Sequence, residues 1–209
     1  RRKLFQARES RPRPHLDDKT VTAWNGLMIS AFAHGAQVLD DDAYLRSACA
    51  AANFLREHLW DSERGVLRRS YREGPAEVDG FADDYAFLVE GLLDLYETGF
   101  DESHLEWALE LQERQDELFL DRQRGGYFGT SGDDASILLR TRESYDGAEP
   151  SANSVSARNL LRLAALAGRD DLRRRAGETL AAFGSELERA PETMPAMLSA
   201  LLMREYGPV

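Results

Sequence analysis

The fold is decided by residues 88–96, which read Leu-Val-Glu-Gly-Leu-Leu-Asp-Leu-Tyr. On a helix, the large apolar side chains of this stretch cover more than one stripe of the surface: Leu88, Val89, Leu92, Leu93, Leu95 and Tyr96. An α-helix that is apolar around most of its circumference is buried on several sides. The stretch therefore predicts an inner helix of a layered helical domain.

The same arrangement recurs along the chain. Residues 24–67, 84–128 and 151–187 each begin with an apolar helix, break at an acidic or glycine-bearing turn, and continue with a more charged amphipathic helix. A fourth helix, 193–206, resembles the first member of another pair. Corresponding positions of the second helices carry Leu45, Leu105 and Leu172. The repeats predict a series of helical hairpins.

The second helices, such as 102–120 and 169–188, carry charged residues over a wide face and belong on the outside. An inner layer of helices wrapped by an outer layer is an α/α toroid, whereas a plain four-helix bundle would give all helices similar one-sided amphipathicity. We therefore predict an all-α fold for residues 1–209: a partial barrel of about seven helices.

Short extended pieces follow the outer helices. Residues 66–71 alternate weakly, and residues 125–128 and 137–139 bracket a Gly132-Asp133 turn, so both regions are expected to form small β-hairpins at the mouth. Arg11-Pro12-Arg13-Pro14 predicts an extended entry to the first hairpin.

The composition excludes several classes of function. The chain carries 37 acidic and 26 basic residues, a net charge of −11, which argues against nucleic acid as a partner. The single cysteine, Cys49, excludes an internal disulfide framework or a CxxC redox motif. No apolar run approaches the roughly 18 residues that span a bilayer, so no membrane partner is expected. The compartment stays open, with the cytoplasm favoured.

Polar and aromatic residues gather at the starts of the inner helices. Because these helices run parallel in a toroid, their N-termini meet at one mouth. Residues 15–19 precede the first inner helix, 79–82 the second and 145–150 the third. The Asp-Gly pairs at 79–80 and 146–147 are separated by the same interval as Leu105 and Leu172. We therefore expect any ligand cleft at this mouth.

Each of these residues also has a structural interpretation. Asp18, Asp83 or Asp84, and Ser151 are good N-caps, which accept hydrogen bonds from the first backbone N–H groups of a helix. Capping does not require aromatic neighbours, or an asparagine inside a buried helix, as at Asn25 and Asn153. Each buried amide needs partners, either from nearby protein groups or from a ligand.

A carbohydrate ligand would use both kinds of residue. Trp24, Tyr85 and Tyr145 are candidate stacking faces for sugar rings, and carboxylates accept hydrogen bonds from hydroxyl groups. Two carboxylates across a cleft can also act as acid and base in glycoside chemistry. The catalytic candidates are Asp18, Asp84 and Glu149. The binding candidates are Arg11, Arg13, Asp17, Trp24, Asn25, Asp83, Tyr85, Tyr145, Asp146 and Asn153.

The sequence offers no metal-ligand spacing, phosphate-binding loop or nucleophile elbow, so no metal or cofactor is expected. His34, His58 and His104 lie on helices away from the mouth and are interpreted as packing or surface residues.

Three motifs resemble one known family. Residues 11–19 with 24–28, residues 83–88 and residues 145–154 are similar to motifs of the YyaL-type thioredoxin-domain-containing proteins, the relatives of spermatogenesis-associated protein 20. The resemblance implies an N-terminal thioredoxin-like domain, absent from this chain. It also implies an (α/α)6 barrel similar to six-hairpin glycosidases and N-acylglucosamine 2-epimerases. This chain would be the C-terminal half or more of that barrel.

Two hypotheses follow from the motifs and the resemblance. The first is a carbohydrate-active domain with hydrolase-like or isomerase/epimerase-like activity. The epimerase relatives use histidines on inner helices, whereas here only the loop residue His15 lies at the mouth. The second is a non-catalytic module that binds a glycan or a protein and supports the thioredoxin-like domain. Because a partial barrel exposes apolar sides of its inner helices, the piece alone is expected to aggregate, self-associate or need its missing N-terminal part.

Overall fold

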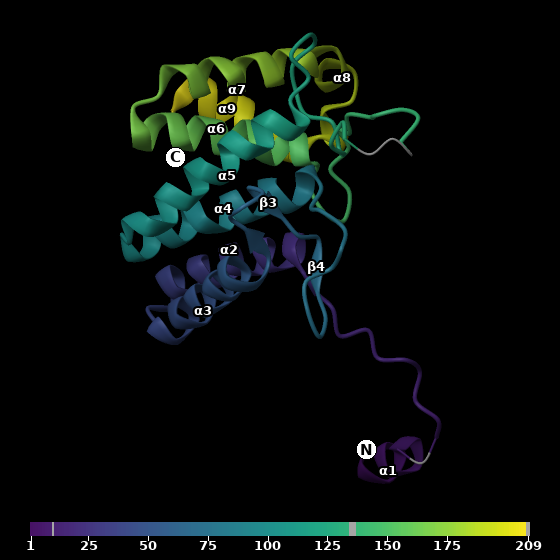
Figure 1. Cartoon of the computed structure of the whole chain (residues 1–209). Coiled ribbons are helices and arrows are strands. Elements are labelled where there is room, and N and C mark those ends of the chain that lie inside the picture. The colour runs from purple at the N-terminus through teal and green to yellow at the C-terminus, as the bar shows by residue number, and fades with distance from the viewer. Residues whose placement is uncertain (10, 134–136, 208–209) are drawn as a thin grey trace.

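The computed structural model describes residues 1–9, 11–133 and 137–207. Helical hairpins are stacked side by side, and each pairs an inner helix with an outer helix (Figure 1). The inner helices are α2 (Thr22–Leu39), α4 (Ala82–Gly99), α6 (Ala152–Ala167) and α9 (Pro195–Tyr206). The outer helices are α3 (Asp42–His58), α5 (Glu102–Phe119) and α7 (Asp170–Ala182). These seven helices confirm the predicted α/α architecture.

The hairpins close through tight turns. Each of the first three inner helices ends at a residue with a left-handed backbone: Asp40 (φ 53°), Phe100 (φ 55°) and Gly168 (φ 65°). The next residue in the first two hairpins is an aspartate N-cap: Asp41 accepts from the Ala43 N–H and Asp101 from the Ser103 N–H. A left-handed cap followed at once by an N-cap reverses the chain within two residues.

Helix α4 lies at the centre of the described structure. Its neighbours are α2 and α6 in the inner layer and α5 in the outer layer. Most of its residues from Ala82 to Leu95 are buried, including Leu88, Leu92 and Leu93, which are fully buried. This is the helix that the apolar stretch at 88–96 predicts. Its burial follows from that pattern because neighbours cover it on several sides.

Helices α2 and α4 approach each other through glycines. A Cβ atom built on Gly26 would lie 2.5 Å from the backbone carbon of Phe87, and one on Gly91 would lie 2.7 Å from the backbone oxygen of Gly26. Only a residue without a side chain fits at either position. The glycine of the Trp24-Asn25-Gly26 motif therefore sets the helix–helix distance.

Three ion pairs join α4 to α6 and were not anticipated from the sequence. Arg158 pairs with Glu90, and the Arg162 guanidinium lies 2.6 Å from an Asp94 carboxylate oxygen and 3.0 Å from a Glu97 carboxylate oxygen. Glu90 and Asp94 are both buried, and burial raises the pKa of Glu90 against the opposing charge of Arg158. Glu90 and Asp94 lie one helical turn apart on the face of α4 that meets α6.

The extended segments differ in part from the prediction. Residues 66–71 do not form one strand, because β3 (Val66–Leu67) pairs with β2 (Trp60–Asp61), while β4 (Ser70–Tyr71) pairs with β1 (Thr20–Val21). The predicted hairpin between 125–128 and 137–139 is wrong for the described residues, since Tyr127 bridges Leu120 instead and Leu138 and Leu139 are exposed. Residues 134–136 of that loop lie outside the described part of the chain.

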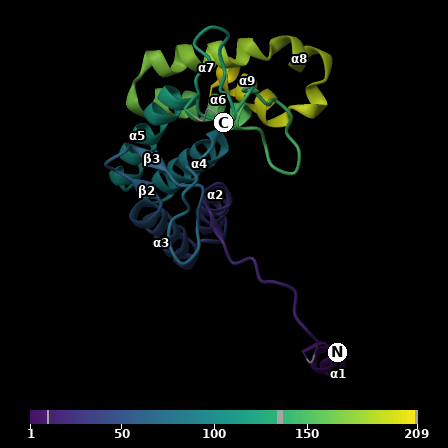
Figure 2. The same ribbon diagram turned by 45° about the vertical axis from the view of Figure 1, so that its right-hand side comes forward.

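Both ends of the chain add short helices. Helix α1 (Arg2–Glu9), which was not predicted, stands away from the other helices at the end of an extended segment (Figures 1 and 2). Near the other end, α8 (Gly184–Arg189) and a 3-10 turn (Pro191–Thr193) precede α9, so the fourth inner helix begins at Pro195 and not at Thr193. Within the described residues, no helix combines the length and apolar character needed to cross a membrane.

Candidate functional site

Asp84 is a buried junction between the first two inner helices. Its side chain is 0% exposed. One carboxylate oxygen accepts from the Ala23 N–H at 2.9 Å, and the other accepts from the Phe81 N–H at 2.8 Å and from the Arg69 guanidinium at 2.7 Å. Asp84 thus ties the start of α2 to the start of α4. The predicted catalytic role of Asp84 is therefore corrected. The carboxylate is buried, and both of its oxygens already accept hydrogen bonds from protein groups.

Arg69 also binds the neighbouring Asp83. Its Nη1 atom lies 2.8 and 2.9 Å from the two Asp83 oxygens, and its guanidinium lies 4.9 Å from the centre of the Phe81 ring. Burial, followed by the charge of Asp83, raises the pKa of Asp84 to about 7, against the opposing effect of Arg69. One guanidinium therefore serves two adjacent carboxylates, and the outer one, Asp83, stays partly exposed.

Tyr85 does not present a stacking face. Its ring is 0% exposed and meets Phe119 edge-on, and its hydroxyl accepts from the Leu67 N–H at 2.8 Å. Burial raises the pKa of this hydroxyl to about 12. The prediction that Tyr85 stacks on a sugar is therefore corrected, because its side chain points into the core.

The two asparagines have protein partners. The Asn153 amide donates to the Tyr127 oxygen at 3.0 Å and to the Glu143 oxygen at 2.8 Å, and its own oxygen accepts from the Tyr127 N–H at 2.6 Å. Asn25 donates to the Val21 oxygen at the start of its own helix. Of the two alternatives left open by the sequence, the structure shows partners within the protein. Asn153 clamps two loop segments against α6.

Asp146 also holds protein segments together, at the starts of α6 and α9. Its two oxygens accept from the Ser151 N–H and the Ala196 N–H, both at 2.8 Å, so it joins the starts of α6 and α9. Ser151 caps α6 as predicted, since its hydroxyl accepts from the Ser154 N–H. The third motif therefore fixes the loop that precedes α6.

The residues that precede α2 lie on an exposed extended segment. Asp18 pairs with Arg72 at 2.7 Å, and Asp17 lies 3.4 Å from Lys19. Arg13 pairs with Glu9 of α1, and Arg11 is exposed. Asp18 does not cap α2, whose N-cap is Val21. None of these candidate residues contributes to the cavity described next.

The mouth holds a cavity of about 330 Å³. We call it the mouth cavity; it lies between the starts of α4 and α6 and the loop that connects α5 to α6. Its lining comprises Phe81, Asp83, Phe87, Tyr127, Gly129, Thr130, Thr141, Glu143, Tyr145, Glu149, Pro150, Ser151, Ala152 and Asn153. The structure thus brings four predicted residues together here: Asp83, Tyr145, Glu149 and Asn153.

Trp24 of the first hairpin is not part of the lining but is bonded to one of its residues. Its indole Nε1–H donates to a Glu149 carboxylate oxygen at 2.8 Å. Both Trp24 and Tyr145 keep exposed rings, 57% and 67% respectively. Residues from all three motifs therefore meet at one opening, which is the arrangement that a polyhydroxyl ligand requires: aromatic faces beside hydrogen-bond acceptors.

Arg69 and Arg72, which form ion pairs with Asp83, Asp84 and Asp18, were not among the predicted site residues. A signal for them was present. The basic run Arg68-Arg69-Ser70-Tyr71-Arg72 lies about ten residues before the acidic second motif, in a chain of strong negative charge. Opposite charges so arranged predict ion pairs at the mouth.

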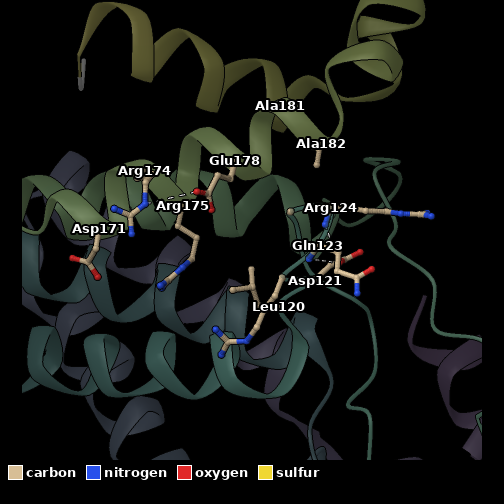
Figure 3. Close-up of a pocket in the computed structure, with 12 residues that line it drawn as sticks. Leu120, Asp121, Gln123, Arg124, Asp171, Arg174, Arg175, Glu178, Ala181 and Ala182 are labelled. Carbon is tan, nitrogen blue, oxygen red and sulfur yellow. Dashed lines mark hydrogen bonds and ion pairs between the residues drawn. The ribbon is translucent and has the colours of Figure 1, made fainter.

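A larger hollow of about 590 Å³ lies between α7 and the loop at 120–125 (Figure 3). Its carboxylates have partners: Asp171 pairs with Arg169, Glu178 with Arg174, and Asp121 accepts from the N–H groups of Gln123 and Arg124. Figure 3 shows Asp171, Arg174 and Glu178 along α7. None of the three motifs reaches this hollow, so the mouth cavity is the better candidate site. Among the described residues, no group of three or more histidine, cysteine, aspartate or glutamate side chains could hold a metal ion.

The sequence of the chain is similar to those of known proteins. It is 47% identical over 208 residues to spermatogenesis-associated protein 20 of Homo sapiens and 45% identical to that of Mus musculus. The chain is a close homologue of these proteins. The match covers 95% of this chain but 26% of the human protein, so the chain spans about a quarter of these relatives. No protein-family model matches it.

Solved structures share the fold. The cellobiose 2-epimerase of Spirochaeta thermophila superposes with a TM-score of 0.71 at 18% identity, over 90% of this chain and 54% of that one. A family 76 α-mannanase of Bacteroides thetaiotaomicron gives 0.63 at 16% identity, over 85% of this chain and 46% of that one. Both are six-hairpin glycosidase-like (α/α) barrels, which confirms the predicted fold class. The chain covers about half the length of each.

Proposed function

We propose that this chain supplies the ligand-binding mouth of a carbohydrate-active (α/α)-barrel domain. The observation that carries the proposal is the mouth cavity, where Asp83, Tyr145 and Glu149 share one lining and Trp24 of the first motif is hydrogen-bonded to Glu149. Solved neighbours with this fold are named for cellobiose, D-mannose and α-1,6-mannan chemistry, which supports a hexose as the ligand.

Within this proposal, Glu149 stays a reactive carboxylate as predicted, and Asp83 takes the place of Asp84 and Asp18. Glu149 has one oxygen bound by Trp24, and its side chain is exposed at the cavity. Another neighbour is an inactive α-1,6-mannanase variant, bound to mannotriose, in which two successive aspartates are replaced by asparagine. Asp83 and Asp84 are also successive aspartates, and Asp83 is the one that lines the cavity.

The alternative is a non-catalytic glycan- or protein-binding module that supports a thioredoxin-like domain. One observation favours it: four mouth carboxylates are already paired with cations. Asp83 and Asp84 share Arg69, Asp18 binds Arg72, and Asp17 lies beside Lys19. A paired carboxylate is a weaker proton acceptor but still binds hydroxyl groups.

The test uses the full-length protein with cellobiose, D-mannose and α-1,6-mannotriose. Binding is followed by saturation-transfer NMR and turnover by NMR of the products. A carbohydrate-active domain is expected to convert at least one sugar, and Glu149→Gln is expected to lose at least about a hundredfold in rate, the usual size of a general acid–base effect. Glu57→Gln, on the exposed face of α3, is the matched control.

The outcomes distinguish a carbohydrate-active domain from a non-catalytic module. Binding without turnover favours the non-catalytic module. If none of the sugars binds, the carbohydrate proposal is overturned.

We also propose that the rest of the barrel covers α2. Trp24, Met28 and Val38 lie on one face of this helix and are 57%, 52% and 83% exposed. Apolar surface of this kind associates in water. The isolated 209-residue chain is therefore expected to self-associate or aggregate in light scattering. A monodisperse monomer with a cooperative melt would contradict this proposal.

A further inference from the structure

The mouth cavity has an unbalanced charge. Three carboxylates line it, from Asp83, Glu143 and Glu149, and its described lining contains no lysine, arginine or histidine. Two cations outside the lining bond to it: Arg69, which is shared between Asp83 and Asp84, and Arg140, whose Nε–H donates to the Thr130 backbone oxygen at 2.8 Å. Together with Asp84, the three carboxylates of the lining outnumber these two cations. The cavity therefore carries net negative charge.

Two of the carboxylates are free of cations. Both oxygens of Asp83 lie within 2.9 Å of Arg69. By contrast, the described ion pairs include neither Glu143 nor Glu149. Glu149 receives only the neutral indole N–H of Trp24, and Glu143 is held through its backbone oxygen by Asn153. Their two negative charges therefore stand at the wall of the cavity without an ion-pair partner among the described residues.

The helix ends nearby oppose this charge but do not cancel it. The N-termini of α4 and α6 point toward the cavity, and each is equivalent to about half a positive charge. Their first N–H groups are already bonded, since Asp84 accepts from Phe81 and Ser151 accepts from Ser154. The partial positive charges of the two helix N-termini, whose N–H groups already have acceptors, are smaller than the two full negative charges of Glu143 and Glu149.

The walls and volume of the cavity define the rest of the ligand. Tyr145 contributes an exposed aromatic ring, and aromatic faces attract cations as well as sugar rings. The Phe81 ring also lines the cavity, but Arg69 lies over one of its faces. A volume of about 330 Å³ corresponds to about eleven water molecules at roughly 30 Å³ each, similar to the number of non-hydrogen atoms in one hexose. The cavity thus has room for one sugar unit.

We propose that the mouth cavity selects its sugar by charge: it takes one hexose unit carrying an amino group in preference to a neutral unit, and it rejects uronates and sugar phosphates. The inference rests on the proposed function, because it names the substrate class of the same site. Charges held at the wall of a partly enclosed cavity discriminate strongly between ligands of opposite sign.

The test measures four probes on the full-length protein: D-glucosamine, D-glucose, D-glucuronate and glucose 6-phosphate. Calorimetry and saturation-transfer NMR are run at about pH 6.5. This pH lies below the pKa of about 7.7 that is usual for an α-amino group, so the amine of glucosamine is expected to be charged. Glucosamine is expected to bind about tenfold more tightly than glucose at low salt, and the anions are expected to give no signal. The preference should shrink as salt screens the two glutamates.

Variants assign the effect to its residues. The double variant Glu143→Gln, Glu149→Gln is expected to bring glucosamine and glucose within about twofold of each other, whereas Glu57→Gln keeps the wild-type order. If glucuronate binds as tightly as glucose, or if the double variant keeps the order, the charge inference is overturned while the proposed function stands. If no sugar of any charge binds, the proposed function itself fails, and the inference fails with it.

Discussion

Two motifs that look alike in sequence, residues 83–85 and 145–149, have different structural roles. Each combines acidic and aromatic residues at the start of an inner helix. Asp84 and Tyr85 follow the N-cap of α4 and are 0% exposed, whereas Tyr145 and Glu149 precede the N-cap of α6 and remain at the surface. For these four residues, those inside the first turn stabilise the fold, and those in the loop before the N-cap stay open to a ligand.

The strongest test of this contrast is Asp84→Ala. Removal of the carboxylate leaves the N–H groups of Ala23 and Phe81 without a partner inside the fold. The loss is expected to be about 3–5 kcal/mol in the free energy of unfolding, as for other broken buried pairs. Chemical denaturation of the full-length protein measures it. Asp83→Ala is the control and should cost much less, because Arg69 keeps its ion pair with Asp84. Equal losses of stability would contradict the structural role assigned to Asp84.

The glycine contact gives the next largest effect. Gly26→Ala places a methyl group 2.5 Å from the Phe87 backbone, and overpacking of this kind costs about 1–3 kcal/mol. Gly35→Ala on the same helix is the matched control, because its methyl group meets Tyr44 at an ordinary 3.7 Å. That variant should gain up to about 1 kcal/mol from helix propensity. Thermal unfolding that ranks the two variants in the opposite order would refute the close approach of α2 and α4.

The pH dependence of stability probes the buried motif alone. Burial raises the pKa of Asp84 from 3.8 to about 7, so the folded chain holds this proton at pH values where the unfolded chain has lost it. The stability that the group contributes is thus complete in acid and is lost as the pH rises from about 4 to about 7, by up to about 1.4 kcal/mol per pH unit. Denaturation of wild type and Asp84→Asn across this range isolates the slope. A wild-type stability that stays level relative to Asp84→Asn from pH 4 to 7 would show instead that Arg69 keeps the carboxylate ionised.

The smallest effect is expected at the open motif. Glu149→Ala removes an exposed carboxylate and one hydrogen bond to Trp24, so stability should change by no more than about 0.5 kcal/mol. Trp24 fluorescence should respond nevertheless, since its indole N–H loses that acceptor. A large loss of stability would mean that the open motif is structural as well, and the contrast would disappear.

The sequence predicted the layers well because burial leaves a periodic trace. The all-round apolar pattern of 88–96 identified α4, and the turn residues at 40–42, 99–101 and 168–170 located three hairpin reversals. The convergence of the motifs was also predictable, since parallel inner helices share one mouth. Trp24 and Glu149 meet there as this reasoning expects.

The sequence could not show which carboxylates face outward. Asp83 and Asp84 differ by one position, yet one lines the cavity and the other is buried, because a helix turns by about 100° per residue. Their shared partner Arg69 comes from a segment whose strand pairing was itself unpredictable, since two-residue strands carry almost no periodic signal. Helix α1 was missed for a related reason: it buries no residue.

The clamp made by Asn153 has a consequence for affinity. One amide side chain holds the backbone of Tyr127 and of Glu143 at the same time, so two walls of the mouth cavity are fixed before any ligand arrives. Ordering a loop at the moment of binding usually costs about 0.5–1.5 kcal/mol for each immobilised side chain. In this protein that entropy is lost during folding, so even a small sugar with few contacts can bind to a preorganised site.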